Sequence, residues 1–416
     1  METQDNIIKN MGSRRGQDCL QTPQESTSGQ QKPFQCRLDE AWVLYYPLTD
    51  RLLVLNAMAK IVWDFYSEGY ETREIASRLA HDFGIPEEQA ERDVVQVLGD
   101  LVDHLPQVDD QEGGDAFIWA VESSFGCATV ADNGELANCG VFQFGRSRVR
   151  VLSGVAELDQ SFFLRFQHRA IGDRMGAASL EIRGNESGYQ LTLDGRALAD
   201  CKTLKQMLSR LIELLLSLEH PHKPMLAYCH AGAVSHRGRS ILMPGDSGVG
   251  KSTLTGFLVA HGFGYLSDDM IAIGEDGLSL LPLPTRLSIK AGSWTILEPL
   301  YPALPKLATF NRYGRSARYI DPPGNYDVLS AAAAPSAIVF PAFSEGAPTR
   351  FTALRPHQTM IRLLEANVRL AGWDAATEEK LAKFIRFVEQ TPAYELRYSE
   401  LPGAMEAIED LLANRP

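Results

Sequence analysis

Two short apolar runs near the start of the chain predict a β-hairpin. Residues 42–46 and 51–55 are rich in aliphatic and aromatic side chains, and the segment 47–50 between them has the composition of a turn. Three stretches with helical spacing follow, with apolar positions at Ile61, Val62 and Phe65, then Ile75, Leu79 and Phe83, then Val94, Val95, Leu98, Leu101 and Val102. A hairpin followed by three short helices predicts a winged-helix domain over residues 36–106.

Polar segments flank this predicted domain. Residues 1–35 are rich in Gln, Ser, Gly and charged side chains, and they hold too few large apolar groups to offset the entropy cost of ordering. We expect them to form a disordered arm. Residues 107–115 combine acidic residues with two glycines, which is typical of a linker.

The remainder, residues 116–416, predicts a mixed α/β domain. We expect β-strands at 117–121, 149–152 and 189–193, an amphipathic helix over 204–218, and helices at 378–388 and 402–412. From residue 225 onward strands, turns and helices alternate, as a layered α/β fold requires. The stretch before residue 218 carries no visible chemistry and is interpreted as the lead-in to a catalytic core.

Composition narrows the classes of partner. The chain of 416 residues is 44% hydrophobic and carries a net charge of −13, which argues against nucleic acid as the main partner. No apolar run approaches the roughly 18 to 20 residues that span a bilayer, so we expect a cytoplasmic protein without a membrane segment. The six cysteines form no CxxC pair, which indicates reduced thiols.

A glycine-rich motif carries the clearest chemistry. Its residues, Gly245, Asp246, Ser247, Gly248, Val249, Gly250, Lys251 and Ser252, satisfy the pattern GxxxxGK[ST] of a phosphate loop. An apolar strand is predicted before it at 239–243 and a helix after it at 252–261, as nucleotide-binding loops require. Lys251 would then neutralise the β and γ phosphates, and the Ser252 hydroxyl would ligate Mg²⁺.

An acid pair and a histidine flank the motif. Asp268 and Asp269 end a predicted strand at 262–266, and His230 lies in an apolar segment, 226–234, ahead of the loop strand. Beside a phosphate site, one carboxylate could hold the metal while the other accepts a proton from an attacking hydroxyl. Without a phosphate site, the acids would be a solvated turn and the histidine a structural side chain.

In their order and spacing these residues resemble the C-terminal domain of HPr kinase/phosphorylase. The resemblance covers the loop, the upstream His230 and the downstream Asp268 and Asp269. It implies ATP and Mg²⁺ as cofactors, Asp268 as the base that deprotonates a serine, Asp269 near Mg²⁺ and His230 near the phosphate. Thr253, which stands where that family has an acidic residue, would complete the nucleotide site. The family's hexamers suggest a homo-oligomer.

The sequence around these residues is more similar to that of HPr-kinase-related serine kinases found with peptide-modification genes. Within this stretch Arg286 and Lys290 share one face of a predicted strand and are candidates for phosphate or substrate contacts, or alternatively solvated charges on an edge strand. Arg312, Arg315 and Arg318 are candidates for a charge-stabilising arginine.

The N-terminal domain resembles PqqD-like peptide-recognition elements. The matching features are Leu55 and Asn56 at a strand end, Ile61 to Trp63 in the first helix, Glu74 to Leu79 in the second, and Asp93 with Val94 in the third. The resemblance implies that a leader peptide binds as an added strand beside the hairpin. The alternative, DNA binding by a winged helix, conflicts with the acidic third helix.

Together these features predict a P-loop, HPr-kinase-like α/β catalytic domain behind a winged-helix PqqD-like domain. The predicted activity is ATP-dependent phosphorylation of a serine on a precursor peptide recruited through its leader. Two alternatives stay open. The chain could be an NTP hydrolase or nucleotide-gated peptide carrier without kinase activity, or a sensor kinase that acts on an HPr-like carrier protein.

Overall fold

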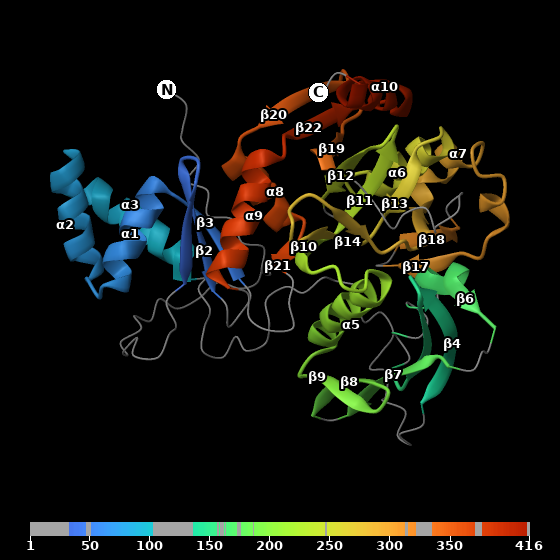
Figure 1. Cartoon of the computed structure of the whole chain (residues 1–416). Coiled ribbons are helices and arrows are strands. Elements are labelled where there is room, and N and C mark those ends of the chain that lie inside the picture. Colours follow the sequence, from blue (N-terminus) through green and yellow to red (C-terminus); the bar gives the residue numbers. More distant parts are fainter. Residues whose placement is uncertain are drawn as a thin grey trace.

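The computed structural model describes residues 33–46, 51–102, 136–155, 158, 162, 164–172, 176–185, 187–245, 248–312, 315–321, 335–370 and 377–413. They form a mixed α/β arrangement with five sheets (Figure 1). The predicted linker 107–115 and the strand expected at 117–121 lie outside these residues, as does the arm up to residue 32. No helix in the described ranges is long and apolar enough to cross a membrane.

The N-terminal unit is a three-stranded antiparallel sheet covered by three helices. Its strands are β1 (Phe34–Leu38), β2 (Ala41–Tyr46) and β3 (Arg51–Asn56), in that order. The helices are α1 (Ala57–Ser67), α2 (Thr72–Phe83) and α3 (Glu87–Val102). The predicted hairpin and helices are confirmed, and β1 is an addition that begins inside the arm expected over 1–35. Its apolar residues Phe34, Cys36 and Leu38 alternate with polar residues, as expected for an edge strand.

Strands β2 and β3 are buried on both faces. One face, with Leu44, Leu53 and Leu55, packs on α1, α2 and α3. The other face belongs to a core shared with α8 (Pro356–Glu365) and α9 (Glu378–Gln390); its sheet residues are Leu38, Ala41, Val43, Tyr45, Leu52 and Val54, and its helix residues include Met360, Leu363, Leu381 and Phe384. The apolar runs of β2 and β3 are continuous because alternate side chains enter two different cores.

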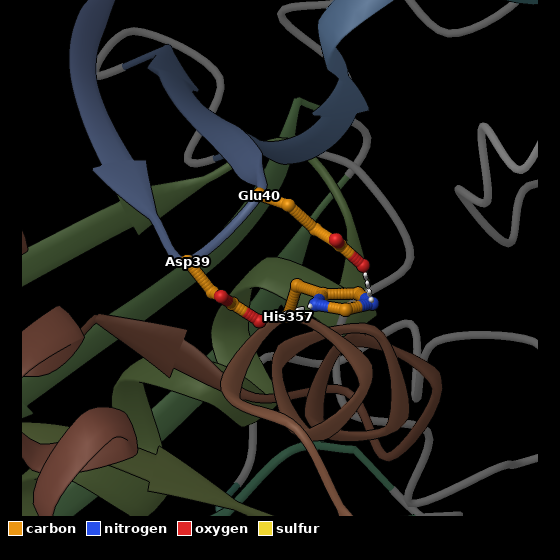
Figure 2. A group of neighbouring side chains, drawn as sticks. All are labelled: Asp39, Glu40 and His357. Carbon is orange, nitrogen blue, oxygen red and sulfur yellow. Dashed lines mark hydrogen bonds and ion pairs between the residues drawn. The ribbon is translucent and has the colours of Figure 1, made fainter.

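Polar contacts fix the position of the N-terminal unit on α8. Asp39 and Glu40 form the turn between β1 and β2, and both point at His357 in the first turn of α8 (Figure 2). His357 Nδ1 lies 3.0 Å from Asp39 Oδ2, and the Arg355 guanidinium donates to Glu40 Oε1 at 2.9 Å. Arg355 and Glu40 are exposed, and such pairs contribute little stability, so the shared apolar core carries the attachment.

A second unit is a six-stranded sheet packed on one helix. In spatial order its strands are β6 (Ala170–Ile171), β4 (Ala137–Phe144), β5 (Ser147–Ser153), β7 (Ala178–Asn185), β8 (Gly188–Leu193) and β9 (Arg196–Cys201). Helix α5 (Leu204–Glu219) begins at a Thr203–Gln206 capping box and buries its leucine-rich face against this sheet. The strands expected at 149–152 and 189–193 and the helix expected at 204–218 are confirmed. This lead-in segment shares its core with the central part, because Tyr228, Ala272 and Leu281 pack in the same cluster.

The central part contains two sheets, and the chain passes from one to the other more than once. One has the order β15 (Leu280–Pro282), β14 (Ile271–Gly274), β10 (Met225–Cys229), β21 (Arg369–Leu370). The other has the order β13 (Gly264–Ser267), β11 (Ala231–His236), β12 (Arg239–Pro244), β19 (Pro335–Phe343), β22 (Ala393–Tyr398), β20 (Arg350–Leu354). In the second sheet β12, β19 and β22 are mutually parallel, so their carboxyl ends lie at one edge.

Helices and a small sheet complete this part. Helix α6 (Lys251–Ala260) and helix α10 (Leu401–Ala413) share a core with β12 and β19. A three-stranded sheet has the order β16 (Leu287–Lys290), β18 (Arg315–Ile320), β17 (Phe310–Arg312), and the short helix α7 (Trp294–Leu297) follows β16. The helices expected at 378–388 and 402–412 are confirmed as α9 and α10.

The shared core predicts unequal effects for one substitution at two sites. Val54 faces α8 and α9 and is buried, whereas Val95, which the sequence pattern assigned to the apolar face of α3, is 52% exposed. Val54→Ala should lower the free energy of unfolding by about 2 kcal/mol, because two buried methyl groups are lost and a cavity remains. Val95→Ala should change it by less than about 0.5 kcal/mol. Urea unfolding of the whole chain, followed by circular dichroism, measures both; equal effects would contradict the docked sheet.

Candidate functional site

The candidate site lies where two neighbouring segments of the chain continue from one central sheet into the other. Strands β10 and β11 are consecutive and separated only by His230, while β13 and β14 are separated by Asp268, Asp269 and Met270. Strand β10 pairs with β14, and β11 pairs with β13. The segments β10–β11 and β13–β14 therefore pass from one sheet to the other at the same point. Figure 1 shows these four strands side by side. The crossing brings together a histidine and two acids that are 38 and 39 positions apart in the sequence.

The loop after β12 lies beside this crossing and leads into α6. Gly248 and Gly250 have φ angles of 110° and 95°, which side chains with a Cβ rarely adopt. At Gly250 a Cβ would also come within 2.9 Å of the Tyr398 hydroxyl. Lys251 Nζ reaches back over the loop and donates to the Gly245 carbonyl at 2.5 Å. Asp246 and Ser247 lie outside the described residues. A loop that ends at a helix N-terminus next to a lysine is suited to bind an anion such as phosphate.

Asp268 is completely buried. Its Oδ2 accepts from the Ser288 N–H at 3.4 Å and the Ser252 hydroxyl hydrogen-bonds to the same carboxylate, while Oδ1 has no hydrogen-bond partner within the described part of the chain. Burial raises the pKa of Asp268 to about 6, Asp269 adds to the rise, and Ser252, Lys251 and Ser288 oppose it. A carboxylate with a pKa near neutrality and an unsatisfied oxygen is suited to accept a proton.

Asp269 is held between a cation and an imidazole. Its Oδ2 accepts from Arg165 Nε at 3.3 Å, and its Oδ1 lies 3.5 Å from His230 Nε2. Arg165 is buried and lies two residues before a 3-10 turn, Gln167–Arg169, in the second unit. No signal in the sequence marks Arg165 as a site residue, because it stands 104 positions before Asp269 and in no motif. The guanidinium offsets part of the free-energy cost of burying this carboxylate.

A cavity of about 830 Å³ opens over these groups. Its lining includes eight of the predicted site residues: His230, Gly248, Gly250, Lys251, Ser252, Thr253, Asp269 and Lys290. Thr253 shares a 2.5 Å hydrogen bond with the Ser293 hydroxyl. The volume lies in the range of small-molecule sites. The Ser252 hydroxyl and the Asp269 carboxylate in this lining also fit a divalent cation, because Mg²⁺ prefers hard oxygen ligands.

The two basic candidates after the acids have different positions. Lys290, at the end of β16, lines the cavity. Arg286 is buried below it, where Nε lies 2.6 Å from Asp321 Oδ1 and the other nitrogens donate to the Tyr319 carbonyl and the Gln167 amide oxygen. Its backbone N–H also donates to the Arg165 carbonyl at 2.9 Å. Arg286 therefore anchors the segment that delivers Arg165 to Asp269.

Among the three arginines considered for charge stabilisation, Arg318 has a described side chain. Its guanidinium stacks on the Trp294 ring, 3.9 Å from the centroid, and Nε donates to Thr309. Arg312 in β17 and Arg315 in β18 are opposite each other in the backbone register of these two strands. Ser316, which follows Arg315 in β18, lines the cavity.

Comparison with known families identifies the N-terminal unit. Residues 41–104 match the family model of coenzyme PQQ synthesis protein D (PqqD). The matched segment spans β2, β3 and the three helices, so the chain contains a PqqD-like domain, with β1 lying just before the match. No curated protein matches the chain.

The buried carboxyl of Asp268 predicts a pH-dependent stability. In the unfolded chain its pKa is near 4 and in the folded chain about 6, so ionisation between these values costs folded-state stability. Asp268→Asn removes this cost. In magnesium-free buffer at pH 7.5 the variant should be more stable than the wild type by on the order of 2 kcal/mol, and the difference should vanish near about pH 3.5.

Denaturant titrations at the two pH values measure this difference. Asp410→Asn, an exposed substitution in α10, serves as the control. An Asp268→Asn variant that is less stable than the wild type at pH 7.5 would contradict the assigned direction of the pKa.

Proposed function

We propose that the chain is an ATP-dependent serine kinase that phosphorylates a precursor peptide recruited by its PqqD-like domain. One observation carries the proposal: Lys251 and the glycine loop share a single cavity with Asp269 and His230, and Asp268 lies directly beneath them. A phosphate-binding loop facing a proton-accepting carboxylate is what phosphoryl transfer to a hydroxyl requires. The resemblance of these residues to HPr kinase/phosphorylase supports the same assignment.

In this proposal the loop holds the nucleotide by its phosphates. Backbone N–H groups around Gly248 and Gly250 and the start of α6 bind the phosphate oxygens, and Lys251 neutralises the charge between the β and γ phosphates. To reach them the lysine exchanges its bond to the Gly245 carbonyl for the phosphates. Ser252 and Asp269 hold Mg²⁺, which when bound neutralises the charge that develops on the leaving phosphate.

Asp268 acts on the acceptor hydroxyl. Its carboxylate accepts the serine proton while the serine oxygen bonds to the γ-phosphorus and the bond from that phosphorus to the β–γ bridging oxygen breaks, so ADP leaves. With a pKa of about 6, Asp268 is ionised at neutral pH and still basic enough to accept this proton. Arg165 and His230 hold Asp269 in place beside it.

The PqqD-like domain would supply the substrate. Strands β2 and β3 are covered by α1 to α3 on one side and by α8 and α9 on the other, so a peptide would add along an edge, β1 or β3. Edge addition uses backbone hydrogen bonds and therefore accepts a variable side-chain sequence. Because the domain is docked on α8, a bound leader starts from a set position and its downstream serine meets the cavity at a raised local concentration.

Two other functions fit some of these features. An NTP hydrolase or nucleotide-gated carrier would use the same loop without phosphorylating a peptide, and a sensor kinase would act on an HPr-like carrier protein. Incubation of the full chain with γ-labelled ATP, Mg²⁺ and the precursor peptide encoded beside its gene distinguishes them. Label in the peptide supports the proposal, free phosphate alone supports the hydrolase, and label only in an added HPr-like protein supports the sensor kinase.

Removal of the proposed base should separate chemistry from binding. Asp268→Asn should lower the transfer rate by about 10² to 10⁴-fold, the usual contribution of a general base, and leave ATP affinity within a few fold. Lys251→Ala should instead weaken ATP binding itself. Transfer of label in single-turnover assays and calorimetric titration with ATP measure the two effects. Normal transfer by Asp268→Asn would refute the base assignment.

Peptide binding along a strand edge predicts a dependence on alternate amides. In an added strand every second N–H faces the sheet, so N-methylation of alternate leader residues in one register should abolish binding. Methylation in the other register should leave the dissociation constant within a few fold. Fluorescence anisotropy of labelled leader peptides with the full chain measures this. Equal losses in both registers would rule out strand addition.

A further inference from the structure

The cavity has two chemically different walls on opposite sides of the loop. One wall follows the acids and is formed mostly by small and polar residues, including Ser288, Lys290 and Ser293, with Ile296 beside them. The other contains two aromatic rings, Phe343 and Tyr398, and continues through residues 399–402 into the start of α10. The proposed chemistry uses the loop and the polar wall, and it leaves the aromatic wall without a role.

Strand order explains why the aromatic wall lies there. The sheet has the order β13, β11, β12, β19, β22, so the loop after β12 has the acids on one side and β19 and β22 on the other. Phe343 ends β19, which lies next to β12, and its register partner Tyr398 ends β22, the following parallel strand. Ligands of α/β proteins bind at the carboxyl ends of parallel strands.

The aromatic pair directly adjoins the loop. A Cβ at Gly250 would lie 2.9 Å from the Tyr398 hydroxyl and 3.7 Å from Phe343 Cβ. The two rings are edge to face, with centroids 5.8 Å apart and planes at 74°, so Tyr398 supports Phe343 from the side. Tyr398 is buried, whereas Phe343 is 58% exposed. A face of the Phe343 ring is therefore open to a ligand that already contacts the loop.

Resting on the proposed function, we propose that the base of a purine nucleoside triphosphate stacks on Phe343. A nucleotide whose terminal phosphate lies between Lys251 and Asp268 must extend its base away from the acids, and the sheet order makes that direction β19 and β22. A planar base on an exposed phenyl ring gains stacking contact, which favours purines because their rings are larger. The cavity of about 830 Å³ has room for a whole nucleotide.

The test compares a ligand with a base to one without. In calorimetric titrations of the full chain with Mg²⁺, Phe343→Ala should weaken ATP binding about ten-fold or more and change the affinity for inorganic tripolyphosphate by less than about two-fold. Phe343→Tyr should restore ATP affinity. Phe83→Ala, a similarly exposed phenylalanine in α2, should change neither.

The outcomes separate this inference from the function on which it rests. Equal effects of Phe343→Ala on ATP and tripolyphosphate, or no effect on either, overturn the stacking proposal while the phosphate site stands. A wild type that binds tripolyphosphate as tightly as ATP overturns it as well. A wild type that binds neither ligand overturns both the stacking proposal and the proposed function. Undiminished binding of tripolyphosphate by Lys251→Ala has the same consequence.

Discussion

Burial of two adjacent carboxylates is the constraint on which the candidate site depends. Two neighbouring charges removed from water destabilise a fold unless cations and hydrogen-bond donors surround them. Here the donors come from distant segments: Arg165 from the second unit, His230 from the strand crossing, and Ser252 and Lys251 from the start of α6. The acids thus tie three parts of the chain together, and the geometry of the cavity depends on the docking of the β4 to β9 unit as much as on the loop itself.

The order of strands gives the cavity a direction. On one side of β12 the chain bends between two sheets and presents polar and ionisable groups; on the other side parallel strands end in aromatic rings. A ligand with a charged end and a flat apolar end can match this gradient in only one orientation. The same arrangement separates the groups suited to proton transfer from those suited to recognition, so one set can change without disturbing the other.

Local patterns predicted the loop, the acid pair and most elements, because strand, turn and helix signals there are short and strong. The alternation of Phe34, Cys36 and Leu38 would also have predicted β1, but the boundary expected between the arm and the domain, at residues 35 and 36, divides this strand. Val95 was assigned to the buried face of α3, whereas Val97 is buried there. Arg165 and Phe343 carried no local signal, since their roles arise from tertiary contacts with residues about 100 positions away. Phosphoryl transfer itself remains a hypothesis from residue chemistry.

The docked face of the PqqD-like sheet constrains how the chain can acquire new partners. Val43, Tyr45, Leu52 and Val54 must match the surface of α8 and α9, so a foreign module inserted in place of this one would leave an apolar patch uncovered. Altered specificity in evolution or in engineering is therefore expected to arise from point changes along the strand edges, with the module itself retained. Chimaeras built by wholesale exchange would need the two helices transplanted with it.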